Sequence, residues 1–116
     1  MGLCEDVAAL GANTAEALAR LCDDRELYEE LLGEILEDFK TYEVKPALEA
    51  GDVATATINA HSLKGVTGNL GLTPLYEQYT KMNDMLKAGQ VDEAEALLEV
   101  TLVTQAKFVE AISQYV

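Results

Sequence analysis

The chain has 116 residues, enough for one domain with a single modest core. Hydrophobic residues make up 49% of it, tryptophan is absent and proline occurs twice, which favours a compact helical protein over a sheet protein or a disordered one. The formal net charge of −13 disfavours binding to nucleic-acid phosphates and to anionic membrane surfaces. We therefore expect one helical domain over residues 1–116 that binds neither nucleic acid nor membrane.

The N-terminal residues and the cysteines predict where the protein works. Glu5 and Asp6 stand where a signal peptide would have a basic and then an apolar region, and no apolar run approaches the roughly 18 residues of a membrane span. Cys4 and Cys22 are isolated, and the single histidine leaves no zinc-type cluster. Two free thiols, no metal site and a cytoplasmic location are expected. The initial Met-Gly and the lack of linkers favour a free-standing protein.

Capping patterns mark the beginnings of the first two predicted helices. An Asn or Asp with a Glu three residues later can satisfy free backbone N–H groups at a helix N-terminus. Pro46 lies inside the second predicted helix and should bend it or end it early. The patterns, Asn13 with Glu16 and Asp23 with Glu26, predict helices over residues 14–22 and 24–50.

A glycine follows the second, third and fourth predicted helices, and a capping residue for the next helix comes shortly after each glycine. Gly51 and Gly89 are suited to end helices, as is Gly71, which is followed closely by Pro74, a residue favoured at the first helical position. The third, fourth and fifth helices are predicted over residues 53–70, 74–88 and 92–115, with N-caps at Asp52, at Thr73 and at Asp92 with Glu95.

Apolar residues repeat at helical spacing in the second, fourth and fifth predicted helices. Such stripes form the core of a helical protein, and the short turns between the helices make consecutive helices antiparallel neighbours. The fold class predicted is all-α: an antiparallel up-down four-helix bundle with a short additional N-terminal helix. The stripes are Leu32, Ile35, Phe39 and Tyr42; Leu75, Tyr79, Met82 and Leu86; and Leu98, Leu102, Val109 and Ile112.

The stretch INAHSLKGVTGNLG, residues 58–71, contains His61, the only histidine of the chain. At about 100° per residue, Lys64, Gly65 and Gly68 share its side of the helix, and the apolar residues lie on the other side. A glycine within a helix costs about 1 kcal/mol relative to alanine. Taken together, these residues predict an exposed imidazole beside a surface stripped of side chains. Taken singly, they also fit an ordinary surface histidine, a solvated lysine and close helix packing.

The chemistry available to His61 depends on a partner. Neutral imidazole, the form that an exposed histidine largely holds at neutral pH, is a nucleophile toward an activated phosphoryl group. Lys64 can pair with phosphate oxygens. The face carries no acid–base partner for His61, and Ser62 lies about 100° away from it. The site can accept and return a group, but the catalyst must come from elsewhere.

The segment AHSLKGVTGNLG closely resembles the signature of histidine-containing phosphotransfer (HPt) domains. That signature is AH-x-LKG, then small residues and a closing G-x-x-G. The resemblance covers nearly the whole chain as a pattern, and it implies a phosphorelay intermediate. The matching positions are His61, Leu63, Lys64, Gly65, Gly68 and Gly71.

The resemblance implies a role for each site residue. His61 matches the phosphoacceptor, which exchanges a phosphoryl group with aspartates of response-regulator receiver domains or takes it from a sensor kinase. Lys64 matches the phosphate-steadying lysine, and Gly65 and Gly68 match the clearance for the docking partner. Asn83 matches a position that often orients the imidazole, although asparagine is shorter than the usual Gln or Glu. The family uses no cofactor of its own, since Mg²⁺ and the catalytic carboxylates belong to the receiver.

Two other functions are compatible with a helical domain of this kind. A degenerate bundle could serve only as a scaffold that binds receiver or kinase domains, but it would have no need of His61. A hydrolase or transferase could use His61 as a general base, but the sequence offers no partner for such chemistry. We therefore expect a phosphoryl carrier and not an enzyme with its own catalytic centre.

Overall fold

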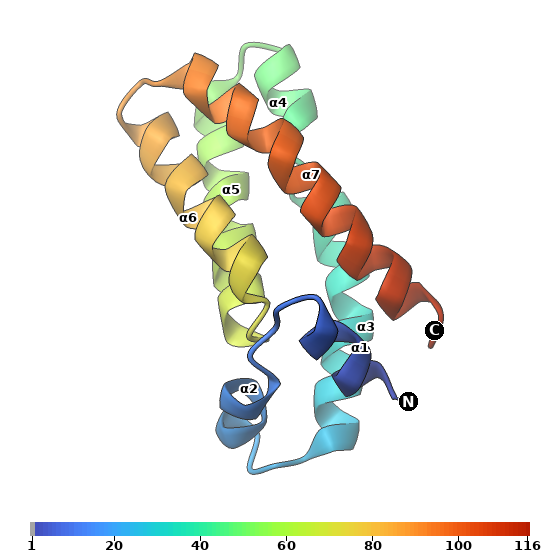
Figure 1. Ribbon diagram of the computed structural model, residues 1–116. Coiled ribbons are helices and arrows are strands. Elements are labelled where there is room, and N and C mark those ends of the chain that lie inside the picture. The colour runs from blue at the N-terminus through green and yellow to red at the C-terminus, as the bar shows by residue number, and fades with distance from the viewer. Residues whose placement is uncertain (1) are drawn as a thin grey trace.

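The structure is a computed structural model that describes residues 2–116, and these residues contain only helices, turns and irregular segments (Figure 1). The all-α prediction is confirmed. No helix in the described part of the chain is long and apolar enough to cross a membrane. The seven helices of residues 2–116 are α1 (Leu3–Ala9), α2 (Thr14–Arg20), α3 (Arg25–Thr41), α4 (Lys45–Glu49), α5 (Val53–Asn69), α6 (Thr73–Lys87) and α7 (Val91–Ser113).

The four long helices surround one hydrophobic core. Helix α5 packs against α6, α6 packs against α7, and α3 contacts both α5 and α7. Helices α1 and α2 lie at the end of the molecule where α5 turns into α6, and α4 lies toward the other end (Figure 1). The core is built from buried side chains of every helix, among them Tyr28, Leu32, Leu63, Tyr79 and Phe108.

The N-terminal region differs from the prediction because it holds two short helices and not one. Helix α1 buries Leu3, Cys4 and Val7, which share one face of two helical turns. A stripe this short gives a weak periodic signal, so tertiary packing decides that these residues become a helix. Both thiols are free, with Cys4 buried and Cys22 exposed.

The predicted helix over 24–50 is divided in two. Helix α3 ends at Thr41, and α4 begins at Lys45 with Pro46 in its first turn. Proline has no N–H to donate and its fixed φ suits the first turn of a helix, so Pro46 begins a new helix here. The early end expected from Pro46 is confirmed.

Two of the predicted caps are confirmed. The side chain of Asn13 accepts a hydrogen bond from the Glu16 N–H at 3.1 Å, and Asp52 Oδ1 accepts one from the Thr55 N–H at 3.1 Å. These caps set the beginnings of α2 and of α5, the helix that carries His61.

The other predicted caps are wrong. Asp23 has a φ of +59°, in the left-handed region, so Asp24 caps α3 instead by accepting from the Leu27 N–H at 3.0 Å. Thr73 does not cap α6 because it is the first residue of that helix. Asp92 does not cap α7 because it lies within the first turn of that helix, and neither helix has a side-chain cap. An Asp or Thr near a helix start does not by itself decide which residue begins the helix.

Candidate functional site

His61 lies on the solvent side of α5. Its side chain is exposed, that of Lys64 one turn later is half-buried, and Ala60 and Leu63 face the core. Neither the imidazole of His61 nor the ammonium of Lys64 forms a hydrogen bond or ion pair with any residue described by the structure. Both groups are therefore available to a partner, as the sequence predicts for this face.

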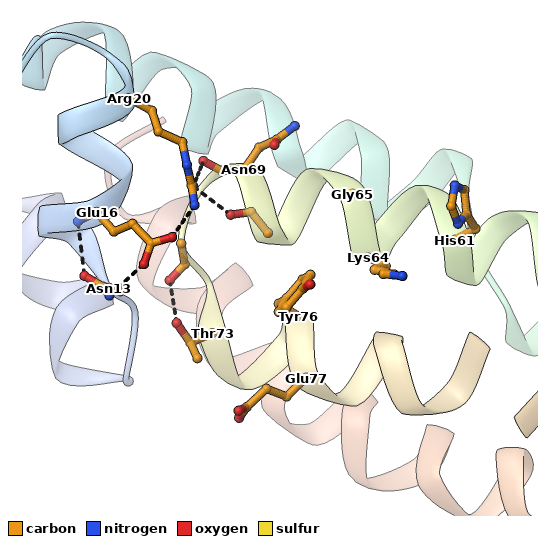
Figure 2. Close-up of a pocket in the computed structure, with 12 residues that line it drawn as sticks. Asn13, Glu16, Arg20, His61, Lys64, Gly65, Asn69, Thr73, Tyr76 and Glu77 are labelled. Atoms are coloured by element: carbon orange, nitrogen blue, oxygen red, sulfur yellow. Dashed lines mark hydrogen bonds and ion pairs between the residues drawn. The ribbon is translucent and has the colours of Figure 1, made fainter. Parts of the chain in front are cut away.

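A cavity of about 510 Å³ extends along α5 from His61 toward the turn into α6 (Figure 2). The structure brings the predicted residues of α5 together on one wall, and it adds walls from α2 and α6 that the sequence pattern does not predict. The lining residues are His61, Lys64, Gly65, Gly68 and Asn69 of α5, Gly71, Asn13, Glu16 and Arg20, and Thr73, Tyr76 and Glu77 of α6.

The two predicted clearance glycines have different surroundings. A Cβ atom built on Gly65 would meet nothing within 4 Å. A Cβ atom on Gly68 would lie 2.8 Å from Cδ1 of Tyr76, because the tyrosine ring packs directly on this glycine. The expectation of open space holds for Gly65 and is wrong for Gly68, where the missing side chain makes room for a ring of the same protein.

Asn83 forms no hydrogen bond with the imidazole. Its side chain is fully buried, and Nδ2 donates a hydrogen bond to the backbone carbonyl of Thr57 at 3.0 Å, one turn before His61. Its Oδ1 atom has no hydrogen-bond partner among the described residues. The orienting role suggested for Asn83 is therefore corrected: the short asparagine side chain ties α6 to the backbone of α5 and forms no hydrogen bond with the ring of His61.

The end of α5 is held by groups from two other helices. The hydroxyl of Tyr28, on α3, donates to the carbonyl of Leu70 at 2.7 Å, and burial raises the pKa of this phenol above its ordinary value, so it remains a donor. Arg20, on α2, donates to the carbonyls of Gly68 and Asn69 at 3.0 and 3.1 Å. Carbonyls at a helix C-terminus lack partners within the helix, so these bonds satisfy them.

The arrangement supplies a nucleophile and a cation. Lys64 is unpaired in a strongly acidic protein, whereas Arg25 and Lys45 form ion pairs with carboxylates. Among residues 2–116, no group of three or more His, Cys, Asp and Glu side chains is placed to hold a metal ion. The imidazole can attack an activated group that a partner presents, and Lys64 can stabilise negative charge on that group.

Comparison with known families matches most of the chain to the Hpt domain. The model of the Hpt domain family matches residues 25–115, which is more than half of the chain and includes His61, Lys64 and both glycines. Comparison with curated proteins and with solved structures gave no match. The matched region begins at the first residue of α3, so α1 and α2 lie outside it.

Proposed function

This chain belongs to the Hpt domain family, whose members take part in phosphotransfer in two-component phosphorelays, and we propose that His61 is its phosphoacceptor. In this proposal His61 receives a phosphoryl group from the aspartyl-phosphate of a receiver domain and passes it to the aspartate of another receiver. The observation that carries the proposal is the exposed, unpaired imidazole beside the free ammonium of Lys64 and the open space at Gly65.

The transfer step balances with the groups available. A ring nitrogen of neutral His61 attacks phosphorus, the bond between phosphorus and the aspartyl oxygen breaks, and the aspartate leaves as a carboxylate. The phosphoimidazolium then loses its proton from the other ring nitrogen to solvent or to the partner. The reverse sequence returns the phosphoryl group to a second aspartate.

The partner supplies the remaining chemistry in this proposal. Receiver domains bring the acidic residues and the Mg²⁺ that neutralise charge on the phosphoryl group. Lys64 then contributes a point charge close to the phosphate oxygens, and Gly65 leaves room for the receiver backbone. The chain acts as a carrier of the phosphoryl group.

Label transfer from receivers tests the proposal. The protein is incubated with each receiver domain of its source organism, phosphorylated in turn with labelled phosphate. We expect at least one receiver to transfer its label within minutes to a site that is labile in acid and stable in alkali, as a phosphoramidate bond is. Because the chain has one histidine, the label should map to the peptide that contains His61. Transfer from none of the receivers, or a label on a hydroxyl residue, would contradict the proposal.

A further inference from the structure

The outer face of α7 carries a row of exposed apolar side chains. Ala96, Val100 and Val103 are spaced by four and three positions, so they share one side of the helix. Val100 is 55% exposed and Val103 is 61% exposed. A single exposed valine is common on a protein surface. Three apolar positions in succession along one side of a helix are instead the pattern by which one helix packs against another.

The row leads into a groove between α7 and α1, which lies beside the C-terminal half of α7 (Figure 1). The groove has a volume of about 410 Å³. Its apolar lining comes from Ala9, Leu10 and Ala111, and its charged lining from Asp6, Lys107 and Glu110. Lys107 lies four residues after Val103 and four before Ala111, so the row and the groove form one continuous surface, which we call the α7 surface.

The α7 surface has the length of a short helix. From Ala96 to Ala111 the distance along α7 is about 22 Å at 1.5 Å per residue, or about four helical turns. An amphipathic helix of that length can lie along the whole row and reach the groove. The row would meet its apolar side, and the rims would meet its polar side.

Charge decides which kind of helix fits. Within α7 there is one cation, Lys107, and the carboxylates are those of Asp92, Glu93, Glu95, Glu99 and Glu110. Neither Lys107 nor Glu110 forms an ion pair in the described part of the chain. A second copy would bring one net charge of −13 against another, which opposes association. A helix that carries Lys and Arg is attracted by the same field.

The α7 surface and His61 lie on opposite sides of the bundle. Helices α3 and α6 each contact both α5 and α7, so α5 and α7 occupy diagonal positions. The outward side of α5, which carries His61, therefore points away from the outward side of α7. A partner bound along α7 leaves the imidazole open to a receiver.

We propose that the α7 surface binds a cationic amphipathic helix of a partner protein. The apolar side of that helix packs along Val100 and Val103, and its Lys or Arg side chains lie close to the carboxylates of Asp6 and Glu110. Such a partner holds the chain in place while His61 remains accessible. The inference goes beyond the proposed function and does not depend on it.

A synthetic cationic helix serves as the probe. It is a fluorescent peptide of about 18 residues, with leucines along one side of the helix and lysines along the other. Its anisotropy is followed as the protein is added. We expect saturable binding of one peptide per chain, with a Kd that rises with salt because ions screen the charges. No saturable binding, or several peptides bound per chain, would overturn the proposal.

Matched apolar substitutions test the location. Val103→Asn removes an apolar side chain from the α7 surface, and Ile58→Asn removes one of similar exposure, 64%, from α5. Valine, isoleucine and asparagine have similar helix propensities, so both variants should keep their fold, which circular dichroism checks. We expect the Kd to rise at least about fivefold for Val103→Asn and to stay within about twofold for Ile58→Asn. Equal Kd values would overturn the proposal.

Matched charge reversals separate the α7 surface from the overall charge. Glu110→Lys and Glu34→Lys change the net charge equally, and both side chains are exposed, but only Glu110 lines the groove. At low salt the Kd should rise severalfold more for Glu110→Lys than for Glu34→Lys. Equal effects would mean that the peptide responds only to the net charge, and would overturn the proposal.

Two further measurements exclude other occupants. Phosphoramidate should label His61 at the same rate with and without saturating peptide, because the peptide lies across the bundle from it. Slower labelling would place the peptide on the His61 side and overturn the proposal. Sedimentation equilibrium should show a monomer. A dimer that Val103→Asn dissociates would show that a second copy occupies the surface, and would also overturn the proposal. Peptide binding by a chain that takes no label from any receiver would overturn the proposed function alone.

Discussion

Gly65 and Gly68 lie one turn apart on the same side of α5, and the space around them differs. Above Gly65 the structure is open, with no atom within 4 Å of a Cβ built there. Above Gly68 the ring of Tyr76 fills the corresponding position, and Tyr76 is itself 39% exposed. The space above Gly65 is empty, whereas an aromatic side chain of α6 packs on Gly68.

The comparison separates two reasons for placing glycine in a helix. Each glycine lowers the stability of α5 by about 1 kcal/mol relative to alanine. At Gly68 the contact with the Tyr76 ring offsets this cost within the folded chain. At Gly65 no contact within the chain offsets it, which supports the proposal that this glycine leaves room for a partner. The two positions therefore respond differently to the same substitution.

The substitution His61→Gln should have the greatest effect. It tests whether His61 is the phosphoacceptor, on which the interpretation of both glycines depends. Labelling by receivers and by phosphoramidate should fall to background, since no other imidazole exists in the chain. The melting temperature should stay within about 1 °C because the side chain is exposed and contributes little to the core. Acid-labile label in this variant would show that the acceptor is another residue.

Gly65→Gln tests whether a partner needs the open space at Gly65. Its side chain would stand one turn from His61, where a receiver backbone must approach, so receiver-dependent transfer should fall at least about thirtyfold, or about 2 kcal/mol in activation free energy. The same change should raise the melting temperature by about 3 °C through the higher helix propensity of glutamine. Labelling by phosphoramidate is the control and should change little. A normal rate with receivers would remove the clearance role from Gly65.

Alanine substitutions at Gly65 and at Gly68 should affect the free energy of unfolding differently. Gly65→Ala should stabilise the protein by up to about 1 kcal/mol, because the methyl group enters open space. Gly68→Ala should give no gain, since the methyl group displaces the ring of Tyr76. In a Tyr76→Ala background, Gly68→Ala should recover the gain, so thermal or urea unfolding should report a coupling of about 1 kcal/mol between the two positions. Additive effects would mean that the ring moves aside without cost.

The smallest effect is expected for Lys64→Ala. The charge of the half-buried Lys64 beside the transferred phosphate should contribute about 1 kcal/mol or less, so receiver-dependent transfer should slow only a fewfold. Lys107→Ala removes an exposed lysine of α7 that does not line the cavity and is the matched control. A complete loss of transfer in a variant that keeps its helicity would mean that Lys64 does more than stabilise charge. An unchanged transfer rate would mean that Lys64 has no role in transfer.

Much of the fold and part of the site could be predicted from local sequence patterns. Helical spacing of apolar residues and the caps at Asn13 and Asp52 are confirmed because they depend on residues within one or two turns. Helix α1 was missed and α3 begins one residue later than its predicted cap implies, since packing and a left-handed residue decide those boundaries. Asn83 was misassigned because its hydrogen bond to Thr57 depends on how two helices pack together.

The helical fold, the solvent-facing position of His61 and the presence of Lys64 and Gly65 beside it all follow from local sequence, because a helix places residues at fixed angles around its axis. What lies opposite that face depends on how the helices pack. The ring of Tyr76 over Gly68 and the α2 wall bonded to the end of α5 join residues far apart in the chain. Such contacts follow from the packing of one helix against another, and the periodicity of a single helix contains no information about its neighbour.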